Sequence, residues 1–322
     1  MDDIKSSHKD PRVNNEFLEW LREQYGDSSL GEVEFTRGKR YEYLGMTLDY
    51  ATKGKLKIDM SRYMDETCIS FPEKLSGVAK HPWNEIFFSV NEDGKQMMES
   101  NSQIFHTTVM KSMFLTKRGR PDILHGVCFL STCVSKPTRG DWNKLKKIMN
   151  FLKYTRNDIL ISETDNNHGI CWFISASFGL YSDCKSHTRA CCTIGGGMIC
   201  TLLNKKKNDS RNSTKGKLNA VDDKVNKTVT VKRFLKSRGF NVNQNTIKQD
   251  NESAIKLESN ATECVGKRLR HFNIKLFYIN NLKEQGELNM EYCHTRNMVA
   301  DYFSKPFTST KFDEFRKIIL NI

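Results

Sequence analysis

Hydrophobic residues recur with helical spacing in many segments of the chain. Asp10-Pro11 predicts the start of the first helix, because aspartate caps a helix and proline suits its first turn. Hydrophobic side chains then return at every fourth position up to Tyr25. The same periodicity predicts further helices at 60–71, 104–117, 122–134, 141–154, 217–238, 251–259, 267–284, 297–304 and 310–320.

Alternating and β-branched runs predict strands between these helices. They lie at 32–37, 41–50, 55–60, 170–178, 190–203, 245–250 and 287–293. Residues 72–103 are polar and irregular, which is typical of a loop. From residue 170 onward the order begins with consecutive strands and ends with alternating strands and helices. This order predicts a mixed α/β or α+β fold with antiparallel and parallel pairings in one sheet.

The polar stretch SETDNNHG, residues 162–169, predicts a domain boundary. A chain of 322 residues is long enough for two domains that each bury a core. We therefore expect domains at 1–161 and 162–322.

The helix predicted at 141–154 has an apolar face and a lysine-rich face. Lysines crowd the polar side at Lys144, Lys146, Lys147 and Lys153. A lysine-rich helix face is most simply interpreted as a solvated surface.

The charge balance favours a polyanionic partner. The formal net charge is +13 and the isoelectric point is near 9.2, so nucleic acid is the first candidate. The 10 cysteines include no CxxC pair or zinc-type spacing. The amino terminus is polar and no apolar run has the length of a bilayer span. We expect an intracellular protein of cytoplasm or nucleus, not secreted, with reduced thiols and no membrane partner; the sequence leaves the oligomeric state open.

Several segments resemble one family in sequence and in order. They are YLGMTLDY (43–50), KRGRPDI (117–123), SDCKSHT (182–188), QDNESAI (249–255), KRLRHFNIKLF (267–277), EYCHTRNMVADYFSKPF (291–307) and FRKIIL (315–320). Together they resemble the second half of a copia-type LTR retrotransposon Pol polyprotein. The resemblance implies a truncated reverse transcriptase palm-thumb-connection remnant at 1–161. It also implies an RNase H-like mixed sheet flanked by helices at 162–322.

The resemblance implies one polymerase motif near the start of the chain. Asp2 and Asp3 match the paired aspartates of the reverse transcriptase centre. A third aspartate, the fingers and most of the palm would precede residue 1. We therefore expect no DNA polymerization by this chain alone.

The resemblance also implies an RNase H centre, in which acidic side chains hold two Mg²⁺ ions. Asp250 and Asp301 match the third and fourth acidic ligands of the family. Ser175, in SASF, stands where the first aspartate is expected. Lys217, in NSTKGKL, stands where the glutamate is expected.

These replacements predict an inactive nuclease centre. Ser175 removes a carboxylate, and Lys217 places a positive charge where a dication would need a negative one. We expect Lys217 to form an ion pair with Asp250 instead. Asp222 and Asp223 lie a helical turn or more beyond Lys217, which is too far to replace the lost glutamate.

Other side chains are candidates for nucleic-acid contact. Lys267, Arg268, Arg270 and His271 lie in a segment that matches the family, and their charges suit phosphates of an RNA–DNA hybrid or of DNA. His294 precedes Asp301, as a mobile histidine does in RNases H, although an exposed loop histidine is the better explanation of the spacing.

Three hypotheses about function follow. The first is a catalytically inactive retrotransposon remnant with sequence-independent affinity for nucleic acid. The second is a residual ribonuclease of RNA–DNA hybrids that uses a rebuilt two-metal site. The third is a domesticated protein-interaction module.

Overall fold

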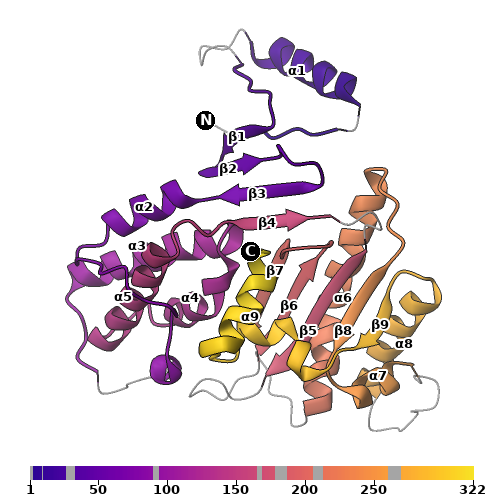
Figure 1. Ribbon diagram of the computed structural model, residues 1–322. Coiled ribbons are helices and arrows are strands. Elements are labelled where there is room, and N and C mark those ends of the chain that lie inside the picture. Colours follow the sequence, from indigo (N-terminus) through magenta and orange to yellow (C-terminus); the bar gives the residue numbers. More distant parts are fainter. Residues whose placement is uncertain are drawn as a thin grey trace.

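The computed structural model describes residues 3–8, 10–26, 33–89, 94–164, 169–177, 187–205, 213–259 and 270–322. Its first half contains an antiparallel sheet of β1 (Arg40–Tyr43), β2 (Met46–Asp49), β3 (Lys55–Asp59) and β4 (Leu160–Glu163), in that order. Figure 1 shows this sheet above the main body of the molecule. The strand β4, which was not predicted, brings the chain back to this sheet after a long helical excursion.

The excursion contains α2 (Ser61–Ile69), η1 (Glu85–Phe88), α3 (Glu99–Arg118), η2 (Pro121–Ile123), α4 (Leu124–Ser131) and α5 (Arg139–Tyr154). The last of these begins with a capping box in which the side chains of Thr138 and Asp141 each accept from the other's backbone N–H. Its apolar face, including Leu145 and Leu152, is completely buried. The predicted helix 141–154 is therefore confirmed, with a start two residues earlier.

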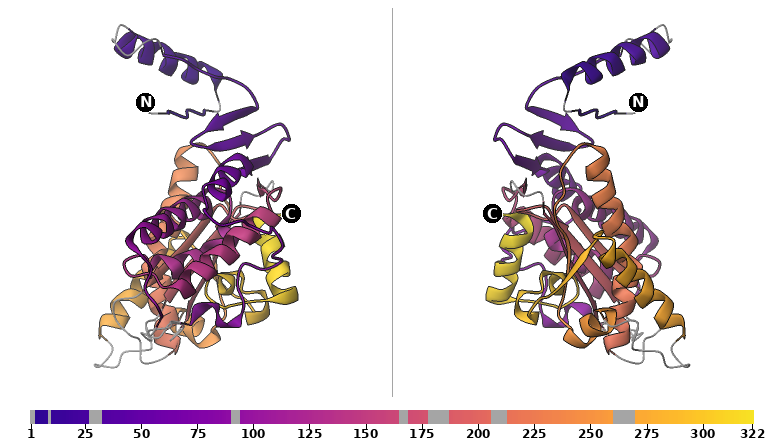
Figure 2. Two further views of the ribbon diagram at one scale, coloured as in Figure 1. Left: turned by 90° about the vertical axis from the view of Figure 1, so that its left-hand side faces the viewer. Right: turned by 90° about the vertical axis from the view of Figure 1, so that its right-hand side faces the viewer.

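The helix α1 (Pro11–Tyr25) stands apart from this body (Figures 1 and 2). The Asp10 side chain accepts from the backbone N–H of Arg12, so the predicted cap is present. No residue of α1 is buried, and Trp20 is 48% exposed. Local capping therefore contributes more to this helix than tertiary packing does.

The second sheet contains β5 (Ile170–Ser177), β6 (His187–Thr193), β7 (Cys200–Lys205), β8 (Asn245–Gln249) and β9 (Asn289–Tyr292). The order is β7-β6-β5-β8-β9, with antiparallel pairing among β5, β6 and β7 and parallel pairing of β5 with β8 and β8 with β9. The predicted mixed α/β fold, with antiparallel and parallel pairings in one sheet, is thus confirmed.

Helices cover both faces of this sheet. One face packs against α6 (Ser213–Ser237), and α7 (Glu252–Ser259) and α8 (Arg270–Glu284) lie beside α6. The other face meets η5 (Val299–Phe303), which follows η4 (Thr295–Asn297) and precedes α9 (Ser309–Leu320). Trp172 and Val225 are buried on the α6 side, whereas Cys191 and Phe303 are buried on the other side.

The structure corrects several predicted elements. The stretch 41–50 is a hairpin, because Leu44 and Gly45 have φ of 50° and 74° and turn the chain between β1 and β2. The stretch 190–203 is likewise two strands, β6 and β7, because Gly195 and Gly197 reverse the chain with φ of 100° and 74°. The predicted helix 297–304 consists of 3₁₀ turns, and 33–37 forms no strand. The predicted loop 72–103 contains η1 and the start of α3.

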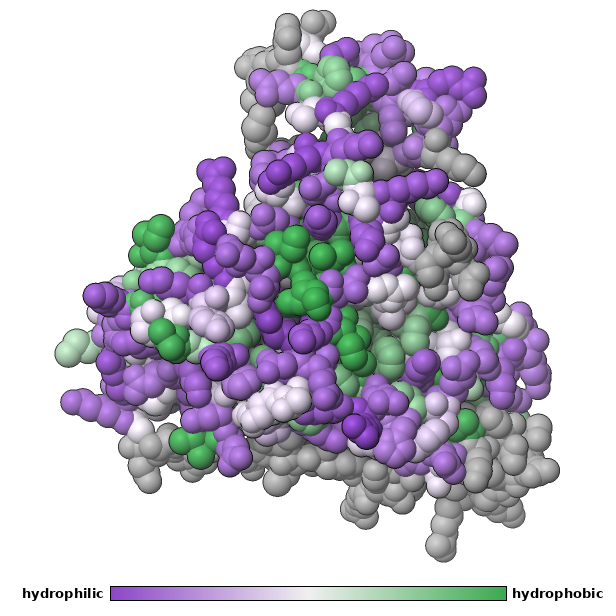
Figure 3. Space-filling model, in the orientation of Figure 1, coloured by the Kyte–Doolittle hydropathy of each residue, from purple (hydrophilic) through white to green (hydrophobic). Residues whose placement is uncertain are grey.

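The surface is mostly hydrophilic in the view of Figure 3, with hydrophobic atoms gathered near its centre, around the end of α9. Ile318 in α9 and Ile322 just after it are 50% and 44% exposed. Across the residues that the structure describes, no helix is both long and apolar enough to cross a membrane.

One hydrophobic core crosses the predicted domain boundary. It joins Met64 and Leu145 from the first half to Phe303 and Phe312 from the second. The indole N–H of buried Trp83 also donates to the carbonyl of Phe307 at 2.8 Å. The division into 1–161 and 162–322 stays a prediction, and the described halves are joined by shared packing.

A buried ionic network joins the same halves. The carboxylate of Asp122 is fully buried and accepts from Arg120 at 2.8 and 2.9 Å and from Arg316 of α9 at 2.9 Å. Arg316 also binds Asp158 at 2.6 Å. Burial raises the pKa of Asp122, but attraction to Arg120 and Arg316 outweighs it and holds the pKa at about 2.

We predict that Arg316→Gln destabilises the protein strongly. Removing one partner of a buried ion pair costs about 3–5 kcal/mol. Here Asp122 keeps Arg120, while Asp122 and Asp158 both lose Arg316. Urea unfolding should show this loss. Arg62→Gln is the matched control, because Arg62 pairs with Glu66 on the surface and its side chain is 86% exposed. Equal stability of the two variants would contradict the assigned role of the network.

The same network predicts acid sensitivity. Because the pKa of Asp122 is depressed from 3.8 to about 2, its contribution is present above pH 3.8 and is lost as the pH falls toward 2. In Arg316→Gln the pKa of Asp122 should rise toward 3.8, so that this loss is smaller and is complete at a higher pH. Acid titrations followed by circular dichroism would measure the two midpoints, and an unchanged midpoint would argue against this assignment.

Candidate functional site

The second sheet gathers the predicted RNase H positions at one place. Ser175 lies near the end of β5, and Asp250 directly follows β8, the parallel neighbour of β5. Asp301 lies in η5, which packs against β5 and β6. Lys217 lies near the start of α6. Residues far apart in the sequence thus converge because central strands and a helix end meet there.

Arg189 completes this cluster. It lies on β6 directly opposite Ser175, and its side chain is only 3% exposed. Its guanidinium donates to the Asp301 carboxylate at 2.8 Å and to the Ser175 hydroxyl at 3.3 Å. The Asp301 side chain is 1% exposed, and its second oxygen lies 2.6 Å from the ammonium of Lys305. A buried carboxylate is therefore neutralised by two cations.

The second carboxylate has its own cation. The ammonium of Lys217 donates to Asp250 at 2.6 Å, with side chains 14% and 7% exposed. This is the ion pair that the sequence led us to expect. The side-chain amide of Gln249 donates to the carbonyl of Lys217 at 3.3 Å and so fixes the first turn of α6 against β8.

The charge of Arg189 is attracted to the carboxylates of both ion pairs. Burial lowers its pKa, while attraction to Asp301 and, less strongly, to Asp250 raises it, and burial dominates. Arginine nevertheless stays charged in proteins, because its ordinary pKa is far above neutrality. We call the five residues Ser175, Arg189, Lys217, Asp250 and Asp301 the charged cluster.

The charged cluster is a poor match for divalent metal. Magnesium selects oxygen ligands with ample negative charge. Here a guanidinium already engages one oxygen of Asp301, and an ammonium already engages one oxygen of Asp250. Among the residues that the structure describes, no group of three or more His, Cys, Asp or Glu side chains is arranged to hold a metal ion.

Sequence reasoning missed Arg189. It stands in the strand HTRACCT, whose residues are almost all buried. A single charge within a buried run is the available signal, because arginine is almost never buried without a partner. The partner lies 112 positions away, so periodicity alone does not identify it.

Several other predicted residues lie away from the charged cluster. Asp3 is exposed, and Asp2 lies outside the described residues. Asp222 pairs with Lys275 at 2.6 Å, and Asp223 accepts from Thr188 at 3.2 Å. Both acids have partners other than the cations of the charged cluster.

The predicted phosphate contacts have no described geometry. Lys267 and Arg268 lie outside the described residues. Arg270 and His271 begin α8, but their side chains are not among those that the structure places. The exposed His294 accepts from the backbone N–H of Arg296 at 3.1 Å and caps a 3₁₀ turn, so it has a local structural role.

Comparisons with known proteins support the resemblance. No family model matches the chain. It is 23% identical over 291 residues to the Retrovirus-related Pol polyprotein from transposon TNT 1-94 of Nicotiana tabacum, covering 88% of this chain and 22% of that protein. It is 26% identical over 198 residues to the Retrovirus-related Pol polyprotein from transposon RE1 of Arabidopsis thaliana, covering 61% and 13%.

A structure of RNase H1 from the halophilic archaeon Halobacterium salinarum NRC-1 aligns with 42% of this chain and 93% of its own, with a TM-score of 0.28 and 9% identity. The chain spans about a fifth or less of the curated Pol polyproteins that it matches. The resemblance predicted from the sequence is confirmed by the two Pol polyproteins: this chain is similar to them over much of its length.

We predict strong energetic coupling between Arg189 and Asp301. Arg189→Gln should lower the free energy of unfolding by about 3 kcal/mol or more, because Asp301 loses a buried partner. The double variant Arg189→Gln/Asp301→Asn should be more stable than the sum of the single changes implies. Urea unfolding of the four proteins measures this coupling, and strict additivity would refute it.

Proposed function

We propose that this chain is a retrotransposon-derived reverse transcriptase and RNase H segment whose nuclease centre is catalytically inactive. The observation that supports this most directly is the pairing of Arg189 with Asp301 and of Lys217 with Asp250. The similarity to Pol polyproteins of plant transposons supports the origin. The domains proposed are 1–161 for the reverse transcriptase part and 162–322 for the RNase H-like part.

The electrostatic argument for inactivity is quantitative. Two unit charges about 4 Å apart interact with roughly 4 kcal/mol at an effective dielectric constant near 20. A dication beside Asp250 would meet Lys217 at that range, and one beside Asp301 would meet Arg189. Each repulsion therefore opposes metal binding by several kcal/mol. Ser175 supplies a neutral hydroxyl where a bridging carboxylate is needed.

The family resemblance implies Mg²⁺, but these residues do not fit a pair of magnesium ions. At least one oxygen of each remaining carboxylate is already engaged by a side-chain cation. We therefore assign no reaction step to a metal in this chain. We also propose no polymerase activity, since Asp3 is exposed and has no acidic cluster around it among the described residues.

We further propose sequence-independent affinity for nucleic acid, either an RNA–DNA hybrid or DNA. The formal charge of +13 supports this, because phosphate contacts by lysine and arginine need no base recognition. Lys267, Arg268, Arg270 and His271 are the proposed contacts, on the strength of the family resemblance. An intracellular location is proposed with it.

We predict no cleavage of a labelled RNA–DNA hybrid with Mg²⁺ or Mn²⁺ beyond that seen with Asp250→Asn. The reason is that the dications have no competent set of ligands. Cleavage by the wild-type chain that Asp250→Asn abolishes would favour the alternative, a residual ribonuclease with a rebuilt metal site.

Metal binding offers a matched comparison. Ser175→Asp/Arg189→Leu/Lys217→Glu restores two carboxylates and removes both cations, so it should bind Mn²⁺ more tightly than the wild type. Electron paramagnetic resonance of free Mn²⁺ measures this difference directly. Equal Mn²⁺ binding by two folded proteins would show that the cations do not control the site.

We predict that hybrid binding weakens steeply with salt. Each neutralised phosphate contributes a slope of about −0.9 in log K against log salt for duplex DNA. Fluorescence anisotropy between 50 and 200 mM salt, concentrations suited to that test, measures the slope. Affinity that is indifferent to salt, or absent, would favour the protein-interaction hypothesis.

A further inference from the structure

The lysine face of α5 is not a uniform solvated surface. Lys144 donates to the carbonyl of Ser89 at 2.7 Å, and Lys153 donates to the carbonyl of Leu75 at 2.9 Å. Lys146 pairs with a carboxylate at 2.6 Å. Within the described part of the chain, Lys147 has no hydrogen bond or ion pair, which distinguishes it from the other lysines of this face.

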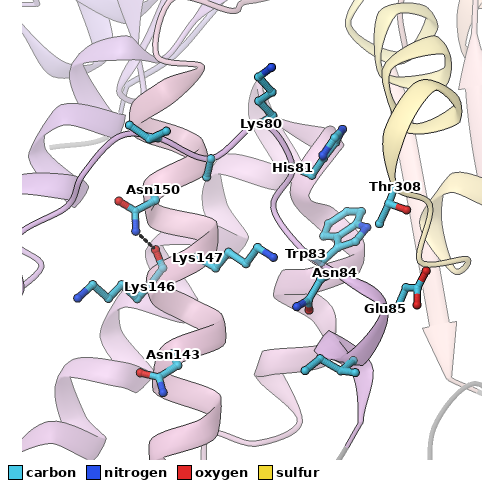
Figure 4. Close-up of a pocket in the computed structure, with 13 residues that line it drawn as sticks. Lys80, His81, Trp83, Asn84, Glu85, Asn143, Lys146, Lys147, Asn150 and Thr308 are labelled. Atoms are coloured by element: carbon cyan, nitrogen blue, oxygen red, sulfur yellow. Dashed lines mark hydrogen bonds between the residues drawn. The ribbon is translucent and has the colours of Figure 1, made fainter.

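Lys147 points into a groove. The groove is open and has a volume of about 780 Å³. It lies between α5 and the segment 78–86, with Thr308 at one side. Figure 4 shows the Lys147 side chain extending from α5 toward Trp83 and Asn84. The side chain is partly buried, and this burial lowers the pKa of Lys147. A partly desolvated ammonium without a counter-ion is an unfavourable arrangement that a bound anion would relieve.

The groove has an excess of positive charge. Lys80, Lys146 and Lys147 line it, whereas Glu85 is the only carboxylate among the described residues that do so. His81 lies 3.9 Å from Asp313, and its Nε2 atom has no hydrogen-bond partner. The cation of Lys146, also in the lining, is neutralised by Glu73 outside it.

The walls of the groove are held by the fold. The buried Trp83 ring is fixed by its hydrogen bond to Phe307. On the other side, the Asn150 side chain accepts from the backbone N–H of Gly77 at 3.1 Å and from the hydroxyl of Ser76 at 3.0 Å. These bonds join α5 to the two residues that directly precede the segment 78–86. The groove is therefore formed before any ligand arrives, which lowers the entropy cost of binding.

We propose that this groove binds a phosphate group, with Lys147 as its principal cation. Lys80 adds positive charge at the rim, and His81, Asn84, Asn143 and Thr308 offer neutral donors within the same lining. The groove lies on α5 and the segment 78–86, whereas the charged cluster lies in the second sheet. The phosphate belongs either to a small phosphorylated molecule or to a nucleic-acid backbone.

Calorimetric titration of the full chain with pyrophosphate tests the small-molecule source. We expect saturable binding by the wild type. Lys147→Gln should weaken it about tenfold or more, the effect expected from losing a charge-assisted hydrogen bond. Lys147→Arg should retain most of it. Lys236→Gln is the charge-matched control, because Lys236 lies at the end of α6, outside the groove lining.

Fluorescence anisotropy with a short labelled oligonucleotide tests the backbone source with the same variants. Weaker oligonucleotide binding by Lys147→Gln than by Lys236→Gln, without pyrophosphate binding, would assign the phosphate to nucleic acid. If Lys147→Gln and Lys236→Gln bind pyrophosphate equally and also bind the oligonucleotide equally, the proposal is overturned. Thermal melting identifies a misfolded variant, and Lys80→Gln then provides the second test, with a smaller loss expected. Pyrophosphate binding is measured separately from binding of the RNA–DNA hybrid. A failure of hybrid binding would therefore count against the proposed function without counting against this groove.

Discussion

A carboxylate in a protein interior needs a nearby positive charge. This requirement determines which side chains surround Asp301 and Asp250 at the second sheet. Asp301 is 1% exposed and is held by the guanidinium of Arg189 and the ammonium of Lys305. Lys217 does the same for Asp250. In a metal-dependent nuclease, dications supply that charge. Here side chains supply it permanently, so the fold keeps its acidic residues without depending on bound metal.

The sequence predicted the ion pair between Lys217 and Asp250, because both residues lie within recognisable sequence motifs. Lys217 stands where a glutamate was expected beside Asp250, and a positive charge at that position predicts an ion pair with the aspartate. Arg189 occupies no such position, and its partner is supplied by a distant 3₁₀ segment. Strong periodicity identified α5, which has one clearly buried face, and the β-branched run identified β8, which is buried on both faces. The stretch 190–203 was misassigned, because its glycine turn interrupts two apolar runs of similar composition.

The first half of the molecule owes its integrity to residues from the second half. Asp122 is neutralised in part by Arg316, and Trp83 is fixed by Phe307. These contacts could not be predicted, because a polar run at 162–169 looks like a boundary whether or not packing crosses it. On α5, the lysines differ in their contacts: Lys147 extends into the groove, whereas Lys144 and Lys153 donate to backbone carbonyls. Equal residue types on one helix therefore have different surroundings.

The shared core also has a consequence for biosynthesis. Phe303, Phe312 and Phe315 belong to the same buried cluster as Met46 and Leu48. A ribosome must therefore add more than half of the chain before the first sheet acquires its final packing. At ordinary elongation rates this interval is on the order of ten seconds. During it the nascent first half exposes apolar surface, so chaperones that bind such surfaces have a longer opportunity to act than with a protein built from self-contained halves.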